Sequence, residues 1–180
     1  MLDKRYQVFI STSGSEMQPE RIILAQTLVG MGFFSWGLEQ RTPLSTAFAR
    51  RQIDDCDYVM ILLGSQYGEQ SVSGVGYMHL EYIYAVTKQK PVIVFMHDDP
   101  DSRDDALHDA KPELREKFKE FRKLLQNEVD QVFTYRSLRD LEMAVRLNMP
   151  QMLERYPVTG WVRPQNTQAL HDEIDRLKAQ

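Results

Sequence analysis

One glutamate in an aromatic helix is the residue of this sequence best suited to chemistry. The stretch GYMHLEYIYAVTKQKPVIVF begins at Gly76 and is typical of a helix followed by a strand, with Glu81 among apolar and aromatic neighbours. A carboxylate there loses hydration on folding, which is costly unless a partner or a ligand compensates. An acid near a helix start is also favoured by the helix dipole, and on position alone the two interpretations are equally good. Tyr77 and Tyr84 lie at helical spacing on the same face as Glu81, and an acid that only interacts with the helix dipole in water does not need such neighbours. We therefore favour a functional role for Glu81.

The elements that must position Glu81 alternate between strands and helices. Short apolar runs predict five strands, at residues 6–11, 33–36, 58–64, 91–96 and 132–135. Helical spacing between these runs predicts helices over residues 19–29, over residues 44–55 with Leu44, Phe48 and Ile53 inward, and around Glu81. It also predicts a long helix with Leu114, Phe118, Phe121 and Leu125 on one face, and a last core helix that Ser137 and Asp140 cap and that reaches about Met149.

Short, continuously apolar strands separated by helices are typical of a parallel sheet covered on both faces. We therefore predict an α/β fold: a flavodoxin-like three-layer sandwich with five parallel strands in the order 2-1-3-4-5. Residues 1–155 form this domain. Residues 156–180 form an extension whose polar helix carries only a narrow apolar seam of Leu170, Ile174 and Leu177, which docks on the domain or on a partner.

In such a sheet, ligands bind beyond the carboxyl ends of the strands where the strand order reverses, here between strands one and three. The loop after strand one is rich in hydroxyl groups, and its Ser11 and Ser13 are candidates to hold ribose or phosphate. The loop after strand three is rich in glycine and leads directly into the helix of Glu81, and its first residue, Gly64, is a further candidate to contact the ligand. Serine and glycine also simply make turns, and GSQYG matches no known phosphate-binding fingerprint.

Three further residues are candidates to contact a nucleotide. Tyr67 and Tyr77 are placed to stack on a base, although aromatic residues beside a sheet are more often core residues. Glu39, just after strand two, is the best candidate for a second acid or an acceptor for a ribose hydroxyl, against the commoner alternative of an exposed loop residue. No spacing of His, Cys, Asp or Glu matches a defined metal site, so we predict no metal.

Composition narrows the functional class. The 180 residues carry 22 basic and 26 acidic side chains, a net charge of −4 with both signs interspersed, so nucleic acid is not expected as a partner. We see no signal peptide and no apolar run long enough to span a membrane. The single Cys56 cannot form an internal disulfide and is expected to be a buried small residue, so we predict a cytoplasmic protein.

Three segments in order carry a resemblance to a known family: RYQVFISTSGSEMQPER, RRQIDDCDYVMILLGSQYG and GYMHLEYIYAVTKQKPVIVFMH. They resemble a TIR-like domain of unknown function that is often found at the N-terminus of larger signalling or defence proteins. The likeness runs from about Arg5 to His97 and more loosely through GWVR at Gly160. That group is more distantly similar to TIR domains and to nucleoside deoxyribosyltransferases, in which a helix glutamate after the third strand acts on the C1′ carbon of a ribosyl group. The matching residue here is Glu81.

The sequence departs from the family at several positions. Gln66 stands where the family has an arginine, Met78 and His79 stand where it has a Thr-Glu pair, and Glu16 with Met17 replaces an Asp-Leu pair. Two hypotheses follow. The first is a nucleotide- or nucleoside-binding enzyme that cleaves an N-glycosidic bond with Glu81, with NAD as a possible substrate and no resident cofactor. The second is a non-catalytic interaction or sensor module that self-associates, binds a partner protein or binds a ligand.

Overall fold

The computed structural model describes residues 3–38 and 40–180, and for residues 165–167 the backbone alone. Its strands are β1 (Tyr6–Thr12), β2 (Phe33–Trp36), β3 (Tyr58–Leu63), β4 (Val92–His97) and β5 (Gln131–Tyr135). Its α-helices are α1 (Gln18–Gly30), α2 (Ser45–Asp55), α3 (Tyr77–Thr87), α4 (Pro112–Glu128), α5 (Leu138–Arg155) and α6 (Pro164–Lys178). Short 3-10 turns cover Ser15–Met17, Pro100–Ser102 and Asp105–Leu107. None of the described helices is both long enough and apolar enough to cross a membrane.

The five strands form one all-parallel sheet in the order β2-β1-β3-β4-β5, which confirms the predicted α/β fold and strand order. Strand β3 lies at its centre and is buried along its whole length, with Val59 beside Phe9 of β1 on one side and beside Val92 of β4 on the other. The chain reverses its direction of progress through the sheet between β1 and β3. The carboxyl ends of these two strands, at Thr12 and Leu63, therefore mark the position where a ligand site is expected.

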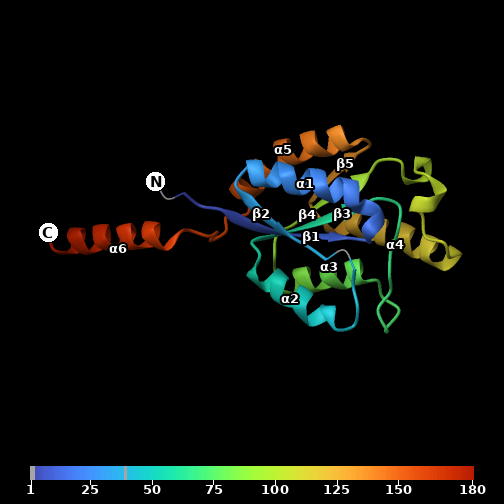
Figure 1. The fold of residues 1–180 in the computed structure, drawn as a ribbon, viewed down its shortest axis with the longest axis horizontal. Helices are drawn as coiled ribbons and strands as arrows, with labels where there is room; N and C mark the ends of the chain where they lie inside the picture. Colours follow the sequence, from blue (N-terminus) through green and yellow to red (C-terminus); the bar gives the residue numbers. More distant parts are fainter. Residues whose placement is uncertain (1–2, 39) are drawn as a thin grey trace.

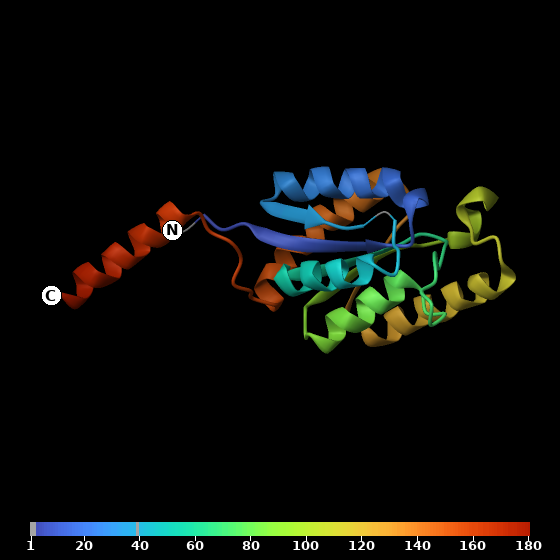
Figure 2. The same ribbon diagram turned by 60° about the horizontal axis from the view of Figure 1, so that its bottom comes forward.

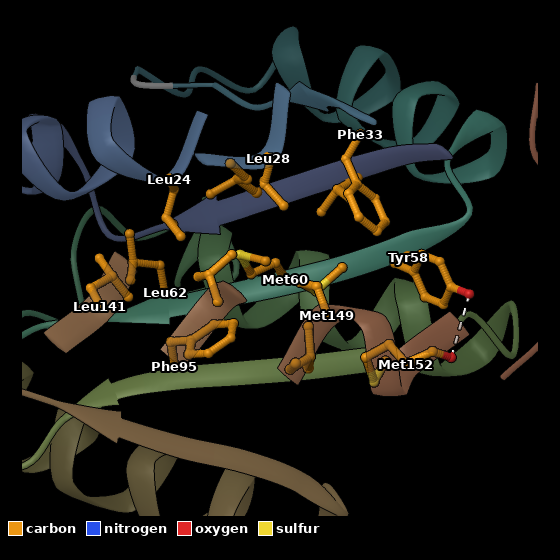
Figure 3. Packing of buried hydrophobic residues seen from close by; sticks show 14 of the residues in the cluster. Leu24, Leu28, Phe33, Tyr58, Met60, Leu62, Phe95, Leu141, Met149 and Met152 are labelled. Carbon is orange, nitrogen blue, oxygen red and sulfur yellow. Dashed lines mark hydrogen bonds between the residues drawn. The ribbon is translucent and has the colours of Figure 1, made fainter. Parts of the chain in front are cut away.

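Helices cover both faces of the sheet: α1 and α5 lie over one, and α2, α3 and α4 over the other (Figure 1). Strand β3 supplies both cores because successive side chains point to opposite faces. Its Tyr58, Met60 and Leu62 pack toward α1 and α5, as Figure 3 shows for this core. Its alternate residues, Val59, Ile61 and Leu63, pack toward the other three helices. The continuous apolar run of β3 follows from this double burial.

Helix α2 differs from the prediction in the residues that it buries. Ile53 is fully buried as expected, but Leu44 is 90% exposed and Phe48 is 41% exposed, so their inward placement was wrong. Leu44 precedes the helix, which begins at Ser45, and Ala49 takes the inward position one turn before Ile53. A small alanine at that position lets α2 lie close to the sheet, and Phe48, one residue earlier, then points about 100° away.

The segment after α5 is tied to the domain before α6 begins. The hydroxyl group of Tyr58 donates a hydrogen bond of 2.7 Å to the carbonyl of Tyr156, and Gly160 donates its N–H to the carboxylate of Asp57. Trp161 then pairs with Arg5, just before β1, through two backbone hydrogen bonds. Beyond this bridge α6 projects away from the body of the molecule (Figures 1 and 2).

We expect the cap of α5 to contribute measurably to stability. The side chain of Ser137 accepts the N–H of Asp140, and the carboxylate of Asp140 accepts the N–H of Ser137, which is the predicted capping box. Replacing Ser137 with Ala should lower the free energy of unfolding by about 1 kcal/mol, because it leaves a helix N–H without its acceptor. Urea denaturation measures this loss. The Ser137→Thr variant keeps the acceptor and should lose less; an equal loss in both variants would contradict the capping role.

We also expect stability to fall as the pH drops from about 7 to about 5. Burial lowers the pKa of His97 below its ordinary value of 6.5, and its Nδ1 accepts the N–H of Asp99. As the pH falls through about 6.5, the unfolded chain binds a proton at this histidine and the folded chain does not, so stability present above that pH is lost below it. Burial lowers the pKa of His79 as well, which adds to the same trend.

Urea denaturation across this pH range tests the contribution of His97. The His97→Asn variant keeps an acceptor for Asp99 but cannot titrate, so its stability should fall less steeply. His171 lies on the exposed helix α6, and His171→Asn is the matched control, which should fall as steeply as the unmodified protein. Equal slopes in all three proteins would rule out His97 as a source of the pH dependence.

Candidate active site

Glu81 is buried near the start of α3, and its carboxylate has protein partners on both oxygens. Its side chain is 6% exposed. The hydroxyl group of Ser11 donates a hydrogen bond of 2.6 Å to Oε1. Arg41 adds a second bond to Oε1 from Nη2, at 2.8 Å, and one to Oε2 from Nε, at 3.2 Å. The dehydration expected from the sequence is therefore present, and a two-pronged ion pair with a hydroxyl group compensates for it.

Arg41 is the functional candidate that the sequence reasoning missed. It lies in the loop between β2 and α2, is 5% exposed, and also donates from Nη1 to the carbonyl of Thr12 at 2.5 Å. One guanidinium group thus joins this loop to the end of β1 and to α3. A signal was available, because a buried carboxylate needs a cation and this loop ends at the same edge of the sheet as Glu81. The sequence alone does not show which arginine pairs with Glu81.

Two cavities meet at Arg41. The first is a gap of about 20 Å³ between α2 and α3, which has room for about one water molecule and is lined by Glu81, Arg41 and Tyr77 among others. The second is a crevice of about 430 Å³ at the carboxyl edge of the sheet, between the loops after β1 and β3. This volume lies within the usual range for a small-molecule site. Arg41 lines both cavities, and Glu81 lines the smaller one.

The loops around the crevice are held together by Asp109. Its carboxylate accepts the backbone N–H groups of Tyr67 and Gly68, at 2.7 and 3.1 Å. Burial raises the pKa of this carboxyl group, and the two N–H bonds act against that rise. Gly68 has a φ of +85°, and a Cβ there would lie 2.4 Å from the carbonyl oxygen of Ser13, so only glycine allows this approach. Asp109 was not among the candidates predicted from the sequence, because no local pattern links it to the loop after β3.

Three of the predicted site residues lie around these cavities. Ser11 is fully buried and bonded to Glu81. Tyr77 lines the small cavity beside Glu81. Ser13 lines the edge crevice and donates a hydrogen bond to Glu16. The structure therefore brings Glu81, Ser11 and Tyr77 together. Ser13 lines the neighbouring crevice, which shares Arg41 with the small cavity.

The other three predicted residues are not part of this group. Gly64 packs against Met17 and Arg103, where a Cβ would lie 2.1 Å from the guanidinium group. Tyr67 is 4% exposed, accepts the N–H of Gly76 and contacts the ring of His79 in the core between α3 and α4. Glu39 lies outside the described residues. A ligand-binding role for these three residues stays a prediction.

Cys56 lies away from the candidate site, just before the amino end of β3. Cys56 is 2% exposed, and burial raises the pKa of its thiol to about 12, so the unreactive thiol form persists at neutral pH. The neighbouring carboxylate of Asp57 raises this pKa further, but burial is the larger cause. In the part of the chain that the structure describes, no group of three or more His, Cys, Asp or Glu side chains is placed to hold a metal ion.

Comparison with known proteins places this geometry in a wider context. No curated protein matches the chain. Among solved structures, the CMP N-glycosidase BcmB of Clostridium botulinum is similar in fold, with a TM-score of 0.51 and 14% sequence identity over 79% of this chain and 99% of that chain. At this identity the likeness shows the fold alone. The model of the family described as "Domain of unknown function (DUF4062)" matches residues 7–150, which span the sheet, Arg41 and Glu81. The chain is therefore a member of the DUF4062 family.

Proposed function

We propose that this domain binds a nucleotide or nucleoside in the edge crevice and cleaves its N-glycosidic bond, with Glu81 as the key carboxylate. The observation that carries the proposal is a dehydrated glutamate, held by Arg41 and Ser11, beside a crevice of about 430 Å³ where the strand order reverses. The similar fold of a CMP N-glycosidase supports it, because that enzyme cleaves the same type of bond.

A single carboxylate suits this reaction. Breaking the bond between C1′ and the base nitrogen leaves positive charge on the sugar, and a nearby carboxylate stabilises that charge or bonds to C1′. Water then attacks C1′, and its proton passes to a carboxylate as the free sugar forms. The hydrogen bond from Ser11 fixes the orientation of Glu81, so the group needs no reordering when the charge develops.

The leaving group decides what else the site must supply. With NAD, the electron pair of the broken bond neutralises the pyridinium, so nicotinamide leaves as a neutral molecule and no acid is needed. A pyrimidine leaves as an anion unless it is protonated. Glu16 lines the crevice and accepts the hydroxyl of Ser13, so we propose it as the acid for such a substrate, with Glu39 as the candidate predicted from the sequence.

Access to Glu81 depends on Arg41. The small cavity beside the carboxylate is too small for a base or a sugar, and Arg41 lines both this cavity and the crevice. We propose that substrate binding draws Arg41 away from Glu81. A phosphate group is a suitable new partner, because arginine binds phosphate with the same paired geometry that it uses for carboxylates. Nucleotides should therefore be better substrates than nucleosides.

The second candidate function, a sensor without turnover, is favoured by two observations. Both oxygens of Glu81 already have partners, so an anchoring role for the loop of Arg41 is enough to explain its burial. Met78, which stands where the family described above has a polar residue of a Thr-Glu pair, is 1% exposed and packs in the core, so it offers no contact to a substrate. In this alternative a ligand in the crevice releases the loop, and no bond is cleaved.

Replacing Glu81 with Gln separates the two functions. The amide keeps nearly the same volume but carries no charge for the sugar, so turnover should fall on the order of a thousandfold or more. Purified protein is incubated with NAD, CMP, cytidine and deoxynucleosides, and the released base is measured by chromatography. Glu154→Gln, on the exposed side of α5, is the matched control and should keep full activity. Turnover that survives in Glu81→Gln would remove this residue from the mechanism.

Ligand binding must be measured alongside turnover. If the unmodified protein binds NAD or CMP by calorimetry but releases no base, the sensor function is favoured over cleavage. If it binds none of these compounds, both functions fail for this set of ligands.

Arg41 should be more important for stability than an ordinary arginine. The Arg41→Ala variant leaves the carboxylate of Glu81 buried and unpaired, so the free energy of unfolding should fall by about 3 kcal/mol or more. Replacing both partners, as Arg41→Met with Glu81→Leu, removes the unpaired charge and should cost less than Arg41→Ala alone. Urea denaturation gives the three values.

Arg51 provides the control for this measurement. It is exposed on α2, and Arg51→Ala should change the free energy of unfolding by no more than about 0.5 kcal/mol. If Arg41→Ala costs as little as Arg51→Ala, the ion pair does not hold the loop in solution.

A further inference from the structure

The described side chains of helix α6 do not pack on the rest of the chain. Its described side chains, from Gln168 to Lys178, are all exposed, and both views show the helix leading away from the sheet (Figures 1 and 2). A helix of 15 residues is marginal in water by itself, because its nucleation is costly and each residue adds little. An uncovered helix of this length therefore needs a packing partner to be stable.

The apolar residues of α6 have the spacing of a coiled coil. Leu170, Ile174 and Leu177 follow one another at intervals of four and three residues and are 42%, 38% and 55% exposed. This is a narrow seam of two positions in seven, whereas a helix that packs on a globular core usually has a wider apolar face. In heptad notation the three residues occupy positions d, a and d. Among parallel coiled coils, Ile at position a with Leu at position d favours two helices over three or four.

The charged residues beside the seam favour a second copy of the same chain. Glu173 falls at position g and Lys178 at position e of the following heptad, five residues later. In a parallel, in-register pair of helices, a g residue lies opposite the e residue five positions later in the other helix. Two copies therefore place opposite charges together at both sides of the seam. Within one chain Glu173 is bonded to Arg176, an exposed pair of low energetic value that a pairing across the seam can replace.

The attachment of α6 leaves the candidate site free. The pairing of Trp161 with Arg5 fixes the start of the extension at the amino end of β1, whereas Glu81 bonds to Ser11 near the carboxyl end of the same strand. Contact through α6 therefore brings two domains together by the edge of the sheet opposite the crevice. Both crevices stay open in such an arrangement.

We propose that α6 pairs with α6 of a second copy as a parallel, in-register, two-stranded coiled coil, so that the chain forms a homodimer. Two heptads bury little area, so the dimer should be weak and should form progressively as the concentration rises from micromolar to millimolar. This inference is independent of the proposed catalytic function, because no residue of the crevice takes part.

Sedimentation velocity on the full chain tests the proposal. The unmodified protein should change from monomer to dimer over that concentration range. Ile174→Asp should remain a folded monomer throughout, as judged by circular dichroism, because it places a charge in the seam. Asp172 falls at the outward position f, and Asp172→Asn is the matched control, which should dimerise like the unmodified protein. A chain that stays monomeric at millimolar concentration, or a dimer that survives Ile174→Asp, would overturn the proposal.

Charge exchange tests whether the partner of α6 is the same helix of a second copy. Glu173→Lys and Lys178→Glu should each weaken the homodimer, because like charges then face each other. A mixture of these two variants should form a heterodimer, and the double variant should regain the homodimer. If the mixture shows no preference for heterodimers, the proposed pairing of positions g and e is wrong.

Cysteine crosslinking tests the direction of the helices. Leu170→Cys should form a disulfide-linked dimer under mild oxidation, because a parallel, in-register pair places the two copies of this position together. Cys56 is buried and should not interfere. Crosslinking only in a mixture of Leu170→Cys with Leu177→Cys would show an antiparallel pair and would overturn the parallel arrangement.

Discussion

The burial of one carboxylate determines how the carboxyl edge of this sheet is arranged. A glutamate that is 5% exposed needs a cation and further hydrogen bonds, and here they come from the loop after β2 and from the end of β1. Arg41 makes both kinds of contact, since it also donates to the carbonyl of Thr12. Strand β1, the β2–α2 loop and α3 are thereby fixed to one another around a single charge pair. Buried pairs of this kind add little net stability, but removal of one partner is costly.

The sheet serves different purposes at its two ends. At the carboxyl edge, the loops after β1 and β3 approach so closely that a Cβ at Gly68 would collide with the carbonyl of Ser13. Asp109 accepts two N–H groups of the loop after β3. At the amino edge, the backbone pairing of Arg5 with Trp161 anchors the extension. Because parallel strands place all their carboxyl ends together, polar groups gather at one edge and leave the other for attachment. The candidate site and the candidate dimer contact are consequently separated by the length of the strands.

Most of the fold was predictable because it rests on local patterns. Runs such as residues 58–63 are apolar at every position since both faces are covered, and that pattern identifies a central parallel strand. The capping box of Ser137 and Asp140 is also local and was found. Helix α2 shows the limit of such reasoning, because Leu44 and Phe48 are apolar but exposed, while Ala49 faces the sheet. Hydrophobicity alone does not show which stripe of a short helix lies inward.

The site was predictable only in part, because its contacts join residues that are distant in the sequence. The burial of Glu81 follows from its own neighbours and was expected. Its pairing with Arg41 joins positions 40 residues apart, and Asp109 reaches Tyr67 across 42 positions. No local pattern encodes such pairs. Tyr67 was a candidate for stacking on a base, but its hydroxyl group accepts the N–H of Gly76 and its ring lies in the core. The sequence does not show to which side of the sheet the loop after a strand directs an aromatic ring.

The charge pair also explains why catalysis and sensing are such close alternatives for this domain. A carboxylate with an arginine on both oxygens is electrically balanced and has little capacity to attack C1′ or to stabilise a sugar cation. In both proposed functions, a ligand that offers the arginine another anion would change this balance, because it would release the carboxylate and the loop at the same time. Whether that event leads to bond cleavage or only to movement of the β2–α2 loop then depends on how near the sugar lies to the released oxygen. The two functions share their first step and differ in the second.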